Sequence, residues 1–486
     1  MLRRRIAFSA MLATCVLTAG CFTGGTSQDA AVLRVAMPFA PKQAMSPWGD
    51  DGALLTQLGI AETLVGLAPD GSPQPLLAQS WTRRSATTWQ FHLREGVKFH
   101  DGLELRAQHV ANAFTAATRA SPIPHVLKGL GLTATAEGDN DLVVSTTEPD
   151  PTLPERLAAP NLVILSSDAY QADGVRVTGT GTGPFVLNEI TGNSAARLTG
   201  FQDYWHGPPR LSGVDVRFIP DGPGRSAALR AGEVDVATAL PATTHPDSAT
   251  AEIPLPRTVS LLLNTSQAPM ADPRLRRVVR DAVDADAIAR AVYQGHADPA
   301  RGIFGPATPW ATTPPPPEPA KARAGGEPFV LATYSERAEL PEVASVVAQW
   351  LRGKGFSVEQ VVRQYSQLEP DLLAGKFDGV IISRSYALDS GDPAAYLAID
   401  FGCSGGYNIA KLCDLAVDSA IADSLATPEP GARRAAVLKA QKLVLDSGAV
   451  VPLVHERAII GRSPHVEGLS LDPHGQLLVR QDTSLR

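Results

Sequence analysis

Two carboxylates three residues apart, Asp389 and Asp392, stand out among the residues that could do chemistry. Paired carboxylates can act as the acid and base of a glycosidase, but residues this close in the chain cannot face each other across a sugar ring. The sequence also lacks the GxSxG, SxxK, HExxH and P-loop patterns of common hydrolases, metalloproteases and nucleotide-binding enzymes. We therefore expect a binding protein and not an enzyme, with no cofactor.

The N-terminus contains the strongest local signal. Residues 3–5 are all arginine, and residues 6–16 form an apolar run that is too short for a stable membrane span. The run ends in residues 17–21 (LTAGC), which resemble a bacterial lipobox. We expect residues 1–20 to be a signal peptide, Cys21 to carry lipid, and residues 21–30 to tether the protein to the membrane surface. An ordinary secretory signal with a chance cysteine is the alternative.

Cysteine usage agrees with export. Cys15 would leave with the signal peptide and Cys21 would be lipidated, so Cys403 and Cys413 remain as an even pair in an oxidising compartment. We predict that they form a disulfide across a short loop, which would contribute roughly 2–3 kcal/mol.

Composition and charge limit the classes of molecule that the chain could bind. The chain of 486 residues has a net charge of −7, with 44% hydrophobic and 19% charged residues. This is the composition of a globular protein, and the absence of a basic run beyond the first few residues argues against nucleic acid as a partner. Ten histidines are scattered without HxH or HExxH spacing.

A βαβ unit in the C-terminal half would position the carboxylates. Residues 329–335 and 356–362 read as strands, and the helix between them opens at Pro341 and has apolar residues at helical spacing. A helix over 368–376 and a buried strand at 380–382 follow. Because ligands bind beyond the carboxyl ends of parallel strands, residues 383–393 are expected at a ligand site.

Several motifs, in order, resemble the extracellular solute-binding proteins of peptide and nickel ABC importers. They are PLLAQSW at 75–81, WQFHLREGVKFHDG at 89–102, GTGPF at 181–185, YWHG at 204–207, LRAGEVD at 229–235, DPRLR at 272–276 and DSGDP at 389–393.

This resemblance implies an α/β fold of the bilobal periplasmic-binding-protein type. Lobe I would comprise residues 31–258 and 457–486, with an inserted subdomain at about 63–180, and lobe II would comprise 259–456. Two chain crossings would form the hinge. The implied partners are a short peptide, an ABC permease and its ATPase subunits. We expect a monomer, held on the outer face of the cytoplasmic membrane through Cys21.

The resemblance also implies the residues that contact the ligand. Asp389 matches the acidic residue that receives the amino end of the peptide in this family, although it could instead cap a turn. Tyr386 stands where the family usually has tryptophan. Arg337 and Arg384 are the two candidates for the peptide carboxylate, and either could be a solvated loop charge.

In lobe I, Ser46 and Trp48 follow the first strand, where a ligand-facing loop is expected. Packing of Trp48 in the core is the alternative.

The main rival is a receptor for a metal chelate such as nickel bound to histidine or a metallophore. His206, His296 and His455 are the histidines considered, but none has a partner at ligand spacing. We therefore expect no site for a bare metal ion. A sugar receptor is a further rival, although aromatic residues make up only 6% of the chain.

Overall fold

The computed structural model describes residues 31–49, 51–121, 123–171, 174–241, 250–311, 323–389 and 392–486, except for the side chains of His125, Leu388 and Asp389. The expected signal peptide, the tether and Cys21 lie outside the described residues, as does the side chain of Asp389.

One sheet of 11 strands runs through the molecule in the order β10-β11-β12-β1-β13-β19-β14-β18-β16-β17, with β15 paired to β19. Its strands are β1 (Val32–Met37), β10 (Phe185–Thr191), β11 (Ala195–Gly200), β12 (Gly213–Phe218), β13 (Val236–Ala237), β14 (Thr250–Leu263), β15 (Ala297–Pro299), β16 (Pro328–Tyr334), β17 (Ser357–Arg363), β18 (Gly379–Ser385) and β19 (Val450–Arg462).

A separate four-stranded sheet has the order β4-β5-β7-β6, and three strand pairs complete the β-structure. The four strands are β4 (Ala78–Arg83), β5 (Thr88–Leu93), β6 (Thr133–Ala136) and β7 (Asp141–Ser145). The pairs are β2 (Val65–Leu67) with β3 (Pro73–Pro75), β8 (Tyr170–Gln171) with β9 (Gly174–Val175), and β20 (Val466–Glu467) with β21 (Ser484–Leu485).

The α-helices are α1 (Gly52–Gln57), α2 (Ala107–Arg119), α3 (Leu153–Arg156), α4 (Gly222–Arg230), α5 (Pro273–Ala282), α6 (Ala285–Ala291), α7 (Glu339–Gly353), α8 (Tyr365–Leu373), α9 (Tyr386–Asp389), α10 (Pro393–Phe401), α11 (Leu415–Ala426) and α12 (Pro430–Ser447). Short 3-10 turns lie at His125–Leu127, Pro160–Leu162 and Ser167–Ala169.

Acidic side chains begin many of these helices because a carboxylate accepts hydrogen bonds from the free N–H groups of the first turn. The capping residues are Asp221, Asp272, Asp284, Asp392, Asp414 and Glu429. Within the described residues, none of the helices combines the length and apolar character that crossing a membrane requires.

The predicted βαβ unit is confirmed. β16 and β17 are parallel, with Pro328 opposite Ser357, and α7 between them buries Val343, Val347 and Leu351 against the sheet. The predicted helix boundaries are corrected: α7 begins at Glu339 and not at Pro341, and the helix expected at 368–376 is α8, which begins at Tyr365 and ends at Leu373. Gly375, whose φ of 72° suits glycine, lies in the turn after it.

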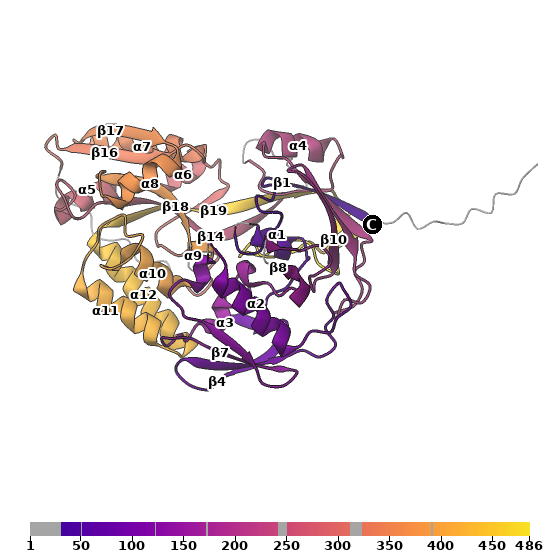
Figure 1. The fold of residues 1–486 in the computed structure, drawn as a ribbon. Coiled ribbons are helices and arrows are strands. Elements are labelled where there is room, and N and C mark those ends of the chain that lie inside the picture. Colours follow the sequence, from indigo (N-terminus) through magenta and orange to yellow (C-terminus); the bar gives the residue numbers. More distant parts are fainter. Residues whose placement is uncertain are drawn as a thin grey trace, which may run out of the picture.

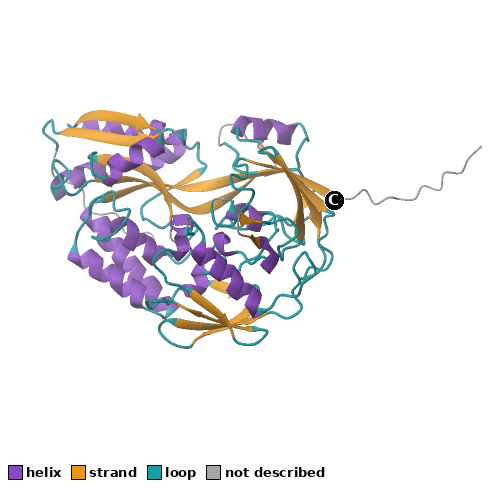
Figure 2. Cartoon of the chain, in the orientation of Figure 1, coloured by secondary structure: helices purple, strands orange, loops and turns teal. Residues whose placement is uncertain are grey.

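Two long strands join the halves of the molecule. β14 and β19 are antiparallel neighbours that run from the first half of the sheet into the second (Figure 1). One hydrophobic core lies between residues 259 and 454, a second packs around β1 and β10–β12, and a third lies between residues 64 and 164. Figure 2 shows the four-stranded sheet of this third core at the far side from α4 and α7. Two lobes joined by two crossing strands, with an added layer in the first lobe, match the predicted architecture.

Candidate ligand-binding cleft

The carboxyl ends of β16 and β18 place the predicted site residues Arg337 and Tyr386 at one edge of the sheet. β16 pairs in parallel with β18, with Ala332 opposite Val380. Arg337 follows three residues after the end of β16, and α9, which contains Tyr386, follows β18 directly. Arg257 on the crossing strand β14 lies opposite Ser385. The edge of lobe II where ligands are expected therefore also lies at the hinge.

A charged cluster forms at this edge around Glu456 of β19. Arg337 Nη1 lies 3.1 Å from Glu456 Oε1, the Ser383 hydroxyl donates to Oε2 at 2.6 Å, and Arg257 Nε lies 3.8 Å from Oε2. The Glu456 side chain is only 9% exposed, whereas Arg337 is 36% exposed. Two guanidinium groups therefore face this one carboxylate, and a guanidinium group is the preferred partner of a ligand carboxylate.

Tyr293 adds a hydroxyl near this cluster. The side chain is buried, and its hydroxyl has no hydrogen-bond partner among the described residues. Burial, together with the negative charge of Glu456, raises the pKa of Tyr293, so the group remains a neutral donor.

Arg384 lies in a different environment from Arg337. Its guanidinium makes two bonds to Asp400, at 2.9 and 3.0 Å, and its charge lies 4.1 Å from the centre of the Tyr407 ring. Successive side chains of a strand point to opposite faces, so Arg384 lies on the other face of β18 from Ser383. Because Asp400 already balances its charge, Arg384 is a weaker candidate for a ligand carboxylate than Arg337.

Tyr386 is fixed by its neighbours. The hydroxyls of Tyr386 and Thr308 lie 2.8 Å apart, and the edge of the ring meets Phe304 with 5.5 Å between ring centres. Tyr386 also lines a cavity of about 250 Å³. The cavity lies between α9, α10 and α12 of lobe II and the added layer of lobe I, which contributes Trp81, Trp89 and Glu155.

Ion pairs lie on the lobe II wall of this cavity and across it. Asp392 caps α10 through the Ala395 N–H at 2.8 Å and pairs with Arg433 of α12 at 2.9 Å. This supports the interpretation of Asp392 as a structural residue. Arg434 reaches across to Asp70 of the other lobe at 2.8 Å. The cavity is therefore an inter-lobe space crossed by a salt bridge.

Sequence reasoning did not find the cavity residues Glu155, Arg433 and Arg434. Trp81 and Trp89 belong to recognised motifs, but nothing in their spacing indicates that they face lobe II. Glu155 lies in a four-residue helix with no periodic pattern. The only available signal was the run of two prolines and two acidic residues at 150–155, which is too general to mark a site.

Ser46 and Trp48 lie in lobe I, away from the cavity lined by Tyr386. Both line a second cavity of about 380 Å³, together with Gln43 and Val175 among others, and none of the cleft residues above contributes to it. The Trp48 ring stacks on Tyr170 at 6.3 Å with a 14° angle between the planes, and it packs against the added layer of lobe I. Within the described residues, the structure does not bring Ser46 and Trp48 to the site of Arg337 and Tyr386.

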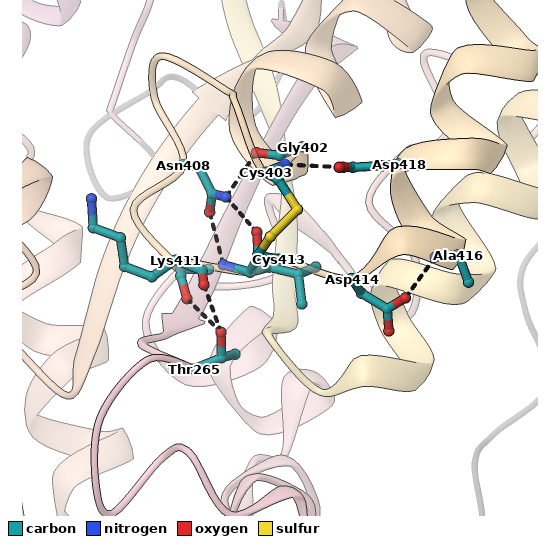
Figure 3. The surroundings of a disulfide bond; sticks show 11 residues. Thr265, Gly402, Cys403, Asn408, Lys411, Cys413, Asp414, Ala416 and Asp418 are labelled. Carbon is teal, nitrogen blue, oxygen red and sulfur yellow. Dashed lines mark hydrogen bonds between the residues drawn. A yellow bond between two sulfur atoms is a disulfide. The ribbon is translucent and has the colours of Figure 1, made fainter.

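Cys403 and Cys413 form a disulfide, as predicted (Figure 3). Inside the loop, the Asn408 amide donates to the carbonyls of Gly402 at 2.9 Å and Leu412 at 2.7 Å. The Cys403 N–H donates to Asp418 of α11 at 2.9 Å. The loop therefore fixes the end of α10 against the start of α11.

The histidines considered for metal binding are separated. His206 stacks on Trp205 with ring centres 5.0 Å apart, His296 pairs with Glu252 at 2.7 Å, and His455 bonds to the Thr258 hydroxyl at 2.9 Å. Across the described residues, His, Cys, Asp and Glu form no group of three or more that could hold a metal ion.

Comparison with known proteins agrees with this geometry. A family model for bacterial extracellular solute-binding proteins, family 5 Middle, matches residues 72–408. A probable di/tripeptide-binding protein of Pseudomonas aeruginosa is 26% identical over 469 residues, which cover 86% of this chain and 87% of that protein. Heme-binding protein A of Haemophilus influenzae is 25% identical over 462 residues, with coverage of 83% and 82%.

The fold is also that of solved members of this group. The crystal structure of NikA from Brucella suis in complex with Fe(III)-EDTA matches with a TM-score of 0.82 at 22% identity, covering 93% of this chain and 99% of the other. This likeness confirms the bilobal α/β fold. The family model spans most of the chain and describes receptors that bind a solute outside the cytoplasm without transforming it. The chain therefore belongs to family 5 of the bacterial extracellular solute-binding proteins, the substrate receptors of ABC importers.

Proposed function

We propose that the chain captures short peptides between its two lobes and delivers them to an ABC permease. The observation that carries this proposal is the placement of Arg337 and α9 after the neighbouring parallel strands β16 and β18. A cation and an acidic helix end at one edge of a sheet suit the two charged ends of a peptide. The name of the di/tripeptide-binding relative from Pseudomonas aeruginosa supports the same ligand class.

Each end of the peptide would meet a group of opposite charge. Asp389 would receive the ammonium, and the exposed part of the Arg337 guanidinium, with Arg257 nearby, would receive the carboxylate. Because the lobes exclude water when they close, such charge-assisted bonds contribute about 1.5–3 kcal/mol each. The side chains of the peptide would lie in wider parts of the cleft. Tyr386 would form the wall beside the first of these side chains.

Binding assays with the mature chain from residue 21 test this function. We expect the chain to bind Ala-Ala-Ala, and acetylation of its amino group or the substitution Asp389→Asn to weaken binding by about 10- to 100-fold. Arg337→Met should weaken binding similarly, whereas Arg290→Met, which removes an exposed arginine of α6, should have no effect.

Binding of nickel–histidine without any binding of peptides would instead make the chain a metal-chelate receptor. The described residues contain no cluster for a bare ion, so such a receptor would have to hold the chelator.

The remaining proposal concerns where the receptor works. Lipid on Cys21 would hold the receptor on the outer face of the cytoplasmic membrane. There it would act as a monomer beside the permease and its ATPase subunits. Mass spectrometry of the mature N-terminal peptide should show a diacylglyceryl group on Cys21. A receptor that is released from cells with an unmodified Cys21 would contradict the anchor and leave the binding function intact.

A further inference from the structure

The inter-lobe cavity has walls of rings and prolines. Trp81 and Trp89 of the four-stranded sheet and Trp310 and Tyr386 of lobe II line it, together with Pro154 next to Glu155. These apolar surfaces come from both lobes, so the space is bounded on two sides by parts of the protein that separate when the lobes open. A charged group held there would be shielded from water, which strengthens its interaction with an opposite charge.

Among the described residues that line the cavity, carboxyl groups outnumber guanidinium groups. Asp392 pairs with Arg433 at 2.9 Å, and Asp70 pairs with Arg434 at 2.8 Å. Glu155 is the third carboxylate on the wall, and among the described residues no side chain makes a hydrogen bond or ion pair with it. Three carboxyl groups thus face two guanidinium groups, and among the described residues of the wall Glu155 is the carboxyl group without a guanidinium partner.

We infer that this cavity is a subsite for a positively charged side chain of the ligand, with Glu155 as its counter-charge. The inference rests on the proposed peptide function and makes it more specific, because it assigns a preference for peptides with a lysine- or arginine-like side chain. The cavity begins at Tyr386 and Ala387 of α9, beside the edge where the peptide is expected. A side chain leaving the peptide there can enter it.

The position of Glu155 gives the subsite a role in lobe closure. Glu155 belongs to α3 in lobe I, whereas Tyr386 and Arg433 belong to lobe II. A ligand anchored on lobe II that also meets Glu155 contacts both lobes, and this contact exists only when they are together. The whole free energy of such a contact stabilises the closed form relative to the open form.

A pair of tripeptides tests the subsite. Ala-Lys-Ala and Ala-norleucine-Ala have side chains of similar length, and only the first carries an ammonium. Burial raises the pKa of Glu155 to about 7, with Asp392 acting in the same direction and Arg433 opposing, so the assay is run at pH 8, where the carboxylate is ionised. The mature chain should bind the lysine peptide about 10- to 100-fold more tightly.

Two substitutions make the test specific. Glu155→Gln should bring the ratio of the two dissociation constants close to one. Glu148→Gln removes the same charge from an exposed position seven residues away and outside the cavity, and it should preserve the ratio. Equal affinity of the unmodified chain for the two peptides, or an unchanged ratio in Glu155→Gln, would overturn the subsite alone. A chain that binds neither peptide would overturn the peptide function and the subsite together.

Discussion

His455 at the hinge should make the folded protein less stable in acid. It lies on β19 opposite Thr258 of β14, where the two crossing strands pass between the lobes, and its side chain is 5% exposed. The Thr258 hydroxyl donates its single hydrogen to the Ile303 carbonyl at 2.8 Å. It must therefore accept a hydrogen bond from Nδ1 of His455 at 2.9 Å, so the neutral form of the ring carries its hydrogen on Nδ1.

Protonation of this ring should destabilise the fold. Burial lowers the pKa of His455 from 6.5 to about 4, and Asp298 offsets this only in part. Between these values the unfolded chain binds a proton that the folded chain does not. The stability contributed by the neutral ring is therefore complete above pH 6.5 and is lost progressively as the pH falls to about 4. The loss at the acid end amounts to roughly 3 kcal/mol.

Urea unfolding of the mature chain and of His455→Asn measures this loss. Asparagine keeps a donor for Thr258 but does not titrate, while all carboxylates titrate alike in both proteins. The difference between the two free energies of unfolding should shift by roughly 2–3 kcal/mol in favour of the variant from pH 7.5 to pH 4.5. His206→Asn, at an exposed histidine, should show no such shift. Parallel pH curves for the mature chain and His455→Asn would refute the reasoning.

Three further sets of substitutions test individual interactions of the fold. Burial raises the pKa of Glu62 to about 7. The free energy of unfolding of the unmodified chain, measured in urea, should therefore fall by roughly 3 kcal/mol relative to that of Glu62→Gln as the pH rises from 4.5 to 7. Equal pH slopes of the two proteins would contradict this. Arg433→Met removes the guanidinium that balances the buried Asp392 carboxylate and should cost ~3–5 kcal/mol of unfolding free energy, which a second change, Asp392→Asn, should partly restore. Replacing Cys403 and Cys413 by serine should cost about 2–3 kcal/mol, because their sequence separation of 10 closes a short loop; an unchanged melting temperature would argue that the bond is absent in the isolated protein.

Local rules were sufficient for the elements that carry the cleft. Strand β16, helix α7 and strand β17 follow from periodicity alone, since the apolar residues of each occur at the spacing of its buried face. The parallel pairing follows from the length of the connection. Because ligands lie beyond the carboxyl ends of such strands, the sequence also predicts the region of Arg337 and Tyr386. The start of α8 was misplaced by three residues, since Tyr365 opens the helix without a side-chain cap.

The partners of charged residues could not be predicted in the same way. Arg384 and Arg337 both follow or end strands and look equivalent in the sequence, yet the first pairs with Asp400 and the second with Glu456 at the hinge. Each partner comes from another element, at distances along the chain of 16 and 119 residues. Glu155 shows the same limit, because the cavity wall opposite it is built from residues more than 230 positions away in α9, α10 and α12.

The charged cluster and the hinge share the same strands, and this links binding to closure. Arg257 and Glu456 lie on β14 and β19, which cross between the lobes, whereas Arg337 belongs to lobe II alone. A ligand carboxylate at this cluster would therefore sit beside the axis of closure, where opening changes distances least. Glu155 lies across the inter-lobe cavity, on the lobe that moves away. A ligand that also reaches Glu155 would add a contact that is made only when the lobes are together. The proposed cation subsite would thus let the receptor favour the closed form for ligands that fill the whole cleft.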